Sequence, residues 1–145
     1  MPLIERSALV EHSAADMYRL VNQVARYPEF LNWCTGTEVL EQAENAMVAR
    51  VSVNIAGIRQ AFTTRNALNE PTHINMQAVD GPFRRFEGQW SFRQLGDDGS
   101  RVGLQLDFEL ASDLLASAFS GGFSWVAKRL VTDFVQRANT VFGQA

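Results

Sequence analysis

The feature that most constrains this chain is a change of hydrophobic periodicity at Thr37. Before it, apolar residues recur at helical spacing, and after it apolar and polar residues alternate. Six successive segments alternate in this way, and their ranges are 37–43, 47–55, 58–68, 73–79, 84–95 and 101–111. Turn-forming residues such as Asp80-Gly81-Pro82 and Asp97-Asp98-Gly99 separate them, so we expect consecutive strands to pair antiparallel.

The last of these segments shows the alternation most clearly. One face of residues 102–110 is apolar and the other is polar. The apolar positions are Val102, Leu104, Leu106, Phe108 and Leu110. Such a strand belongs to a sheet with one face in a core and the other in water.

The first 36 residues predict a strand and two helices. Residues 3–11 resemble a strand, and Ser13 with Asp16 forms a capping sequence for a helix over 14–25. Pro28 is expected to stop that helix and to open a second short helix through Phe30 and Leu31.

The C-terminal segment, 113–142, carries a long helical stripe. Its apolar residues step by three and four: Leu115, Phe119, Phe123, Val126, Leu130, Phe134, Ala138 and Val141. Gly121-Gly122 lies within the stripe, where we expect a kink or an interruption.

These elements predict one α+β domain over residues 1–145. Seven strands make a sheet roughly 29 Å wide, whereas a helix with its side chains is about 10–12 Å across. One long helix therefore covers the apolar face only if the sheet curls around it. The enclosed space is filled either by aromatic side chains, of which eight of the ten Phe lie at or after Phe83, or by a ligand.

Polar residues on the inward face favour a cavity over a full core. In strand 58–68, Phe62 shares its face with Gln60, Thr64 and Asn66, while Arg59, Thr63 and Arg65 lie on the other face. A buried amide without a partner costs about 1–3 kcal/mol, so these groups require a partner, water or a ligand.

Catalytic and metal-binding motifs are missing from the sequence. His12 and His73 lack ligand spacing and are expected to be surface or strand-end residues, and Cys34 has no basic neighbour to activate it. We therefore expect no catalytic residue, no metal and no required cofactor.

The charge balance argues against a general nucleic-acid binder. The chain has 13 Lys and Arg against 16 Asp and Glu, a net charge of −3, so we expect no DNA partner. Basic residues still gather locally, at Arg59, Arg65, Arg84 and Arg85 and again at Lys128, Arg129 and Arg137. A lone cysteine and the lack of an apolar run of ~18 residues predict a cytoplasmic protein.

Several motifs resemble one family. The run Tyr27-Pro28-Glu29-Phe30-Leu31-Asn32-Trp33-Cys34 is similar to the Tyr-Pro-x-Phe-Leu-Pro-Trp-Cys signature of the coenzyme Q-binding, START-like proteins, although Asn32 stands where the family usually has proline. Matches to the family's bacterial branch follow in order along the chain: Thr64-Arg65-Asn66-x-Leu68, Val79-Asp80-Gly81-Pro82-Phe83, Gly88-x-Trp90-x-Phe92 and Leu106-Asp107-Phe108-Glu109.

The resemblance implies a helix-grip fold, in which a seven-stranded antiparallel sheet curls around a long C-terminal helix. It also implies an apolar tunnel for a lipid, in some members ubiquinone. In a toxin of the bacterial branch it implies binding to the large ribosomal subunit and a block of subunit association. A polyketide cyclase label, common in the family, is its weakest implication.

Three hypotheses follow. The first is a carrier or chaperone of a hydrophobic ligand, most simply a quinone, with transient membrane contact and with Thr64 and Asn66 bonding the quinone oxygens. Its expected lining is Phe62, Thr64, Asn66, Met76, Trp90, Phe92, Phe108, Phe119, Phe123 and Val126. The second is a ribosome-directed inhibitor that uses Arg59, Arg65, Arg84 and Arg85. The third, a cyclase, needs an acid–base pair that the sequence does not offer.

Overall fold

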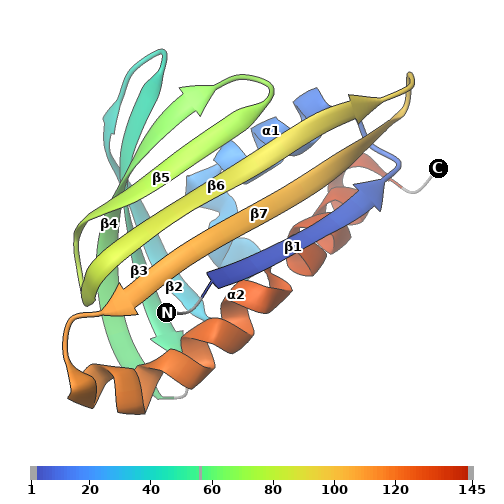
Figure 1. Cartoon of the computed structure of the whole chain (residues 1–145). Coiled ribbons are helices and arrows are strands. Elements are labelled where there is room, and N and C mark those ends of the chain that lie inside the picture. The colour runs from blue at the N-terminus through green and yellow to red at the C-terminus, as the bar shows by residue number, and fades with distance from the viewer. Residues whose placement is uncertain (1–2, 56, 144–145) are drawn as a thin grey trace.

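A computed structural model describes residues 3–55 and 57–143. It has one seven-stranded sheet, a long C-terminal helix and two short helical segments after the first strand (Figure 1). The elements are β1 (Leu3–Val10), α1 (Ala14–Asn22), the 3-10 helix η1 (Val24–Glu29), β2 (Cys34–Gln42), β3 (Ala46–Ile55), β4 (Ile58–Asn69), β5 (His73–Asp80), β6 (Phe83–Leu95), β7 (Gly99–Leu110) and α2 (Asp113–Phe142).

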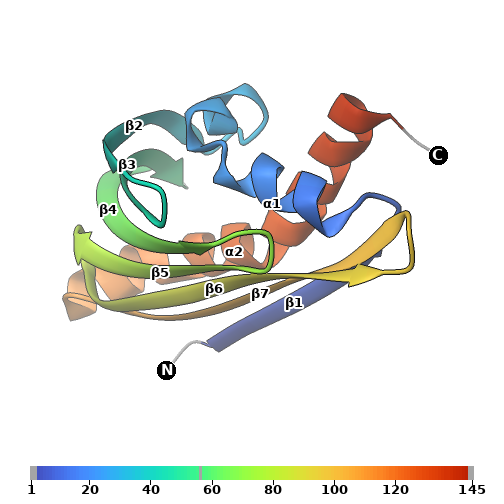
Figure 2. The ribbon, with the colours of Figure 1, turned by 90° about the horizontal axis from the view of Figure 1, so that it is seen from above.

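The sheet is antiparallel throughout, in the order β1-β7-β6-β5-β4-β3-β2. Strands β2 to β7 form a meander, and β1 joins its far side by pairing with β7, with Leu3 opposite Asp107. Figure 2 shows the sheet curling so that β2, β3 and β4 rise around α2. The predicted helix-grip architecture is confirmed.

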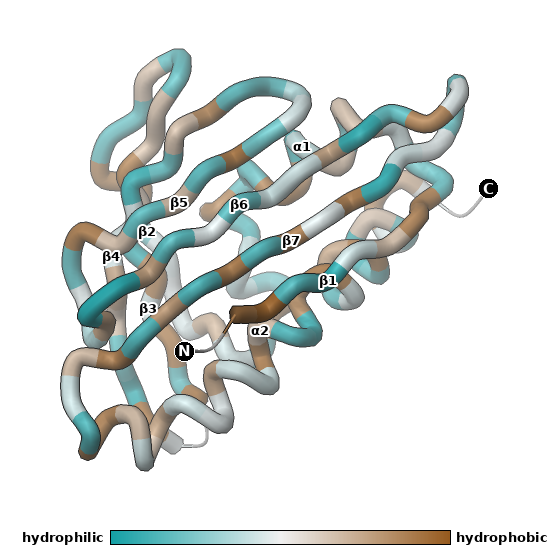
Figure 3. Tube along the Cα trace, viewed as in Figure 1, coloured by the Kyte–Doolittle hydropathy of each residue, from teal (hydrophilic) through white to brown (hydrophobic). Residues whose placement is uncertain are grey.

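The two faces of the sheet differ in polarity. The inner face, turned toward α2, carries the predicted apolar residues of β7, and all five are buried. Along β6 and β7, polar and apolar positions alternate in Figure 3, as a half-buried strand requires. The face turned away from α2 is called the outer face below.

The turn at Pro28 differs from the prediction. Helix α1 starts as expected, with Ser13 Oγ accepting a hydrogen bond from the Asp16 amide at 3.1 Å, but it ends at Asn22. Pro28 lies near the end of η1 and does not open a helix through Phe30 and Leu31. The proline ring would clash with the carbonyl of Val24, four residues earlier, so the chain continues as a tighter 3-10 helix.

Helix α2 is continuous through Gly121-Gly122, so the interruption that the two glycines led us to expect does not occur. The stripe holds from Phe119 to Ala138, but Val141 is 50 % exposed in the last turn. Trp125 is 60 % exposed, because at 100° per residue it lies on the opposite side of the helix from Phe123.

Aromatic rings join α2 to the sheet. The ring of Phe123 packs against Phe108 and Phe83 at centroid distances of 4.8 and 5.2 Å. The β5–β6 turn closes tightly on this cluster, because at Gly81, with φ +132°, a Cβ atom would lie 2.5 Å from Phe62 Cβ. No helix among residues 3–55 and 57–143 is long and apolar enough to cross a membrane.

Candidate functional site

An internal cavity of about 90 Å³ lies between the curled sheet and α2. Its walls come from β3 to β7, from α2, and from the η1 region. Seven of the ten residues predicted to line a ligand site do line it: Phe62, Thr64, Asn66, Met76, Trp90, Phe123 and Val126.

The other three predicted residues lie in the core around the cavity. Phe92 packs edge-on against Tyr18 of α1, with ring centroids 5.5 Å apart. Phe108 and Phe119 pack on Phe123, at 4.8 and 5.7 Å. They support the cavity wall and do not form its surface, because the inner face of a curled sheet is longer than the cavity it encloses.

Sequence reasoning missed several lining residues. Tyr27 and Trp33 reach the cavity from the segment that precedes β2, and Phe86 and Phe134 reach it from β6 and α2. Tyr27 and Trp33 belong to the motif that marked the family resemblance, so a signal for them was present. Phe86 and Phe134 lie at apolar positions of the sequence pattern, but the sequence did not distinguish them as lining residues.

Asn66 is the polar group that stands out in this apolar cavity. It is 6 % exposed and lies between Met47 of β3 and Met76 of β5 in the sheet register. Within the described residues, no group donates a hydrogen bond to its Oδ1 atom, and none accepts one from the buried Nε1 of Trp33. Both groups retain hydrogen-bonding capacity that a polar head group or water would satisfy.

The cavity is small in this conformation. Ligand pockets for small molecules usually measure about 300–1,000 Å³, whereas 90 Å³ has room for about three water molecules. A ring with a long apolar tail therefore enters only if α2 and the sheet separate.

The titratable groups beside the cavity are suited to structure. The Tyr27 hydroxyl donates a hydrogen bond to the Val21 carbonyl, and burial raises its pKa above the ordinary value. Burial also raises the pKa of the Cys34 thiol, which keeps it protonated and unreactive at neutral pH. The lining residues include no carboxylate, histidine or lysine.

His12 lies just past the end of β1, as expected, but it is buried and does not lie on the surface. It is 7 % exposed and its Nε2 hydrogen-bonds Asn139 Oδ1 at 2.7 Å, while its ring packs on Phe142. The physical reason is tertiary: the last turns of α2 cover the β1–α1 connection, which a linear pattern does not reveal.

The four arginines predicted to contact the ribosome divide into two pairs. Arg84 Nη1 donates to Glu109 at 2.8 Å and Arg85 Nη2 donates to Asp107 at 2.8 Å, so both are neutralised by carboxylates of β7. Asp107 raises the pKa of Arg85 further. Arg59 and Arg65 are exposed on the outer face of β4, with no ion pair to any residue that the structure describes.

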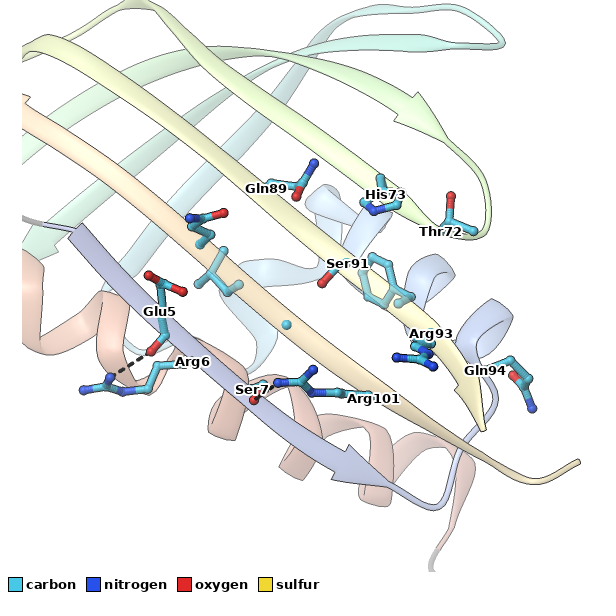
Figure 4. A pocket seen from close by; sticks show the side chains of 14 residues that line it. Glu5, Arg6, Ser7, Thr72, His73, Gln89, Ser91, Arg93, Gln94 and Arg101 are labelled. Carbon is cyan, nitrogen blue, oxygen red and sulfur yellow. Dashed lines mark hydrogen bonds between the residues drawn. The ribbon is translucent and has the colours of Figure 1, made fainter. Parts of the chain in front are cut away.

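A second, open hollow of about 590 Å³ lies on the outer face, across β1, β7, β6 and β5 (Figure 4). Side chains of Arg93, Arg101, Ser7, Ser91 and His73 surround it. Sequence reasoning did not find it. The predicted hairpin turn at Asp97-Asp98-Gly99 was the available signal, since it places the strand of Arg93 beside that of Arg101.

Comparison with known proteins agrees with this architecture. Residues 10–135 match the model of the polyketide cyclase / dehydrase and lipid transport family. The fold is similar to that of the ZhuI aromatase/cyclase from Streptomyces sp. R1128, with a TM-score of 0.85 and 16 % identity over 99 % of both chains. The chain therefore belongs to the polyketide cyclase / dehydrase and lipid transport family, a START-like family.

The chain is also similar to two proteins whose names describe different roles. The chain is 46 % identical to the ribosome association toxin RatA of Vibrio cholerae over 144 residues, 99 % of this chain and all of that protein. It is 28 % identical to the mitochondrial coenzyme Q-binding protein coq10 of Schizosaccharomyces pombe, over 91 % of this chain and 84 % of that protein. The resemblance inferred from the motifs is confirmed.

Proposed function

We propose that this protein associates with ribosomes, at the large subunit, and limits their assembly from subunits. The observation that carries the proposal is the 46 % identity, over 99 % of the chain, to a protein named a ribosome association toxin. The small volume of the cavity is consistent with action through the surface, and Arg59 and Arg65 are candidate contacts because they are exposed cations. We propose a cytoplasmic location on the same ground, because that is where ribosomal subunits assemble.

Sucrose-gradient profiles after overexpression test this proposal. Free subunits are expected to accumulate at the expense of assembled ribosomes, and the protein is expected to sediment with the large subunit. Unchanged profiles, with the protein left at the top of the gradient, would exclude it. R59Q/R65Q tests the two candidate contacts, with R19Q as a control for the loss of an exposed arginine on α1, where Arg19 is ion-paired with Asp16.

A second candidate function is the binding of a hydrophobic ligand, most simply ubiquinone or a related lipid. Two unsatisfied polar groups in an apolar cavity favour it. The Nε1 of Trp33, the Thr64 hydroxyl and the Nδ2 of Asn66 can donate to a quinone carbonyl, whereas Asn66 Oδ1 would accept from the hydroxyl of the reduced quinol or from water. Transient membrane contact would supply such a ligand.

Quinone titration by tryptophan fluorescence tests the second function. Trp33 and Trp90 line the cavity whereas Trp125 is exposed, so W125F removes the background signal and leaves the two reporters. Quenching that saturates at micromolar quinone, together with a lipid found by mass spectrometry of extracts, supports binding. A flat titration and an empty extract contradict it.

We propose that neither function is enzymatic. Cyclases need a positioned acid or base. Among the residues that line the cavity, Tyr27 alone carries an ionisable group, and its hydroxyl donates a hydrogen bond to the Val21 carbonyl. A binding protein of this kind requires no cofactor, and a quinone would be its bound ligand.

A further inference from the structure

Two arginines face each other on the outer face of the sheet. Arg93 of β6 is directly opposite Arg101 of β7 in the register, and both are exposed. Like charges in this arrangement destabilise a sheet. No carboxylate among the described residues forms an ion pair with either one, whereas Arg84 and Arg85 of β6 are both paired with carboxylates of β7. An anion bound between Arg93 and Arg101 would offset the repulsion.

The side chain of Ser91 lies over the backbone of Gly103, beside the two arginines. Gly103 lies between Ser7 of β1 and Ser91 of β6 in the register, and a Cβ atom at Gly103 would lie 2.7 Å from Ser91 Oγ. Arg101 Nη2 donates a hydrogen bond to Ser7 Oγ at 3.2 Å, which holds the guanidinium over this hollow (Figure 4). His73, opposite Ser91, closes the β5 side. Guanidinium, hydroxyl and imidazole groups thus surround one small concave surface.

A row of amides continues the polar surface. Gln105, Gln89 and Asn75 are in register across β7, β6 and β5, and Gln89 Nε2 donates to Asn75 Oδ1 at 2.8 Å. The residues that line the hollow include one carboxylate, Glu5, which is opposite Gln105 in the register. They include three arginines, Arg6, Arg93 and Arg101, so positive charge is in excess. Amides and hydroxyls exchange hydrogen bonds with ribose hydroxyls, and arginines bind phosphates.

We propose that this hollow on the outer face docks the sugar–phosphate backbone of double-helical RNA. Arg93 and Arg101 contact phosphates, and the amide row faces the wide, shallow minor groove with its 2′-hydroxyls. The inference rests on the proposed ribosome association and deepens it, because it names ribosomal RNA as the partner and a surface other than Arg59 and Arg65 as the contact. Because the net charge of the protein is −3, attraction to RNA phosphates has to come from a local basic patch such as this one.

The test measures binding of the full chain to purified large ribosomal subunits and to a short RNA duplex over a series of salt concentrations. R93Q/R101Q is expected to weaken both affinities at least about tenfold and to lower the slope of log affinity against log salt by about two. R93K/R101K is expected to keep the salt slope and lose part of the affinity, since lysine lacks the fork of guanidinium donors. R50Q/K128Q removes the same charge from exposed positions outside the hollow and is expected to bind as the wild type.

Equal binding by R93Q/R101Q and the wild type overturns the inference, and so does an equal loss in R50Q/K128Q. A third arm uses vesicles of phosphatidylglycerol. If R93Q/R101Q loses vesicle binding and keeps RNA binding, the hollow serves a lipid surface and the inference is wrong. If the wild type does not bind subunits at all, ribosome association fails, and the RNA duplex alone then decides whether the hollow binds RNA.

Discussion

At the residue scale, Asn66 determines most of the cavity's chemistry. It occupies a position where the strand pattern calls for an apolar side chain, and its register neighbours on both sides are methionines. An amide held there without a donor for its Oδ1 lowers stability. A loss of folding stability at one residue is typical of a binding position, where the side chain serves function rather than stability.

N66L is therefore expected to stabilise the protein while removing a ligand contact. The free energy of unfolding should rise by about 1 kcal/mol, because an unsatisfied buried amide is replaced by an apolar group of similar size. Urea unfolding measures the change. N69L, on the exposed end of the same strand, should stay within about ±0.5 kcal/mol. A clear loss of stability in N66L would mean that Asn66 has a structural partner.

Gly81 carries a second residue-scale prediction. G81A should destabilise the protein by about 1–3 kcal/mol, because φ is +132° and the added Cβ would collide with Phe62. The matched control is G36A, where an added Cβ meets no atom within 4 Å. Thermal unfolding of both variants checks the difference. Equal melting temperatures would contradict the tight closure of the β5–β6 turn.

At the element scale, a carboxylate of η1 connects this helix to α2, beside the packing of Tyr27 on Phe134. Glu29 accepts hydrogen bonds from Arg26 of η1 at 3.0 Å and from Arg137 of α2 at 2.7 Å. Arg137 also lies over the ring of Phe30, with its Cζ 4.9 Å from the centroid. Because η1 supplies Tyr27 to the cavity wall, this contact connects the position of the C-terminal helix to the shape of the site.

The Glu29 contact predicts a pH-dependent stability. Hydrogen bonds from Arg26 and then Arg137 lower the pKa of Glu29 below its ordinary value of 4.5. A lowered folded-state pKa stabilises the fold above the unfolded pKa and loses that effect as the pH falls through the folded pKa. E29Q should therefore be less stable than the wild type at neutral pH and match it in strong acid. Urea unfolding at several pH values measures this, with E44Q as the unpaired control.

At the scale of the whole molecule, the curled sheet presents two separate surfaces. Its inner face and α2 enclose the apolar cavity, and its outer face carries the hollow between Arg93 and Arg101. The strands β6 and β7 contribute to both, because successive side chains point to opposite faces. Two binding functions can thus coexist on one sheet, with Leu104 as the residue common to both linings.

The two surfaces predict that their variants separate the two functions. A127L places three more carbons in the cavity wall and should abolish quinone binding while leaving ribosome association intact. R93Q/R101Q should have the opposite effect. Fluorescence titration and subunit co-sedimentation measure the two functions side by side, and urea unfolding verifies that both variants fold. Loss of both functions in both variants would show that the surfaces are coupled.

The class of fold was predictable because its signals are local. Alternation in β7, the turn residues between strands and the stripe on α2 each follow from a few neighbouring residues, and together they predict a curled sheet around a helix. The second short helix expected after Pro28 and the expected interruption at Gly121-Gly122 were both wrong. At Gly121-Gly122 the low helix propensity of two glycines is outweighed, because the turns on both sides pack against the sheet through Phe119 and Phe123.

The candidate site was predictable in part. Alternation alone placed Phe62, Thr64 and Asn66 on the inner face, and the structure puts all three in the cavity wall. Phe92, Phe108 and Phe119 also point inward, but inward orientation does not distinguish a residue that lines a cavity from one that packs behind it. That distinction depends on how far the sheet curls, which is a property of all seven strands together.

The sequence by itself determined the element order, the two faces of the sheet and the family. Those properties follow from periodicity and from short motifs, which act over a few residues. The tertiary structure alone decided the cavity of about 90 Å³, the burial of His12 under α2, the pairing of Arg84 and Arg85 with β7 carboxylates, and the opposition of Arg93 and Arg101. Each of these features depends on the register between strands or on the packing of α2. Both are set by contacts between residues that are far apart in the chain.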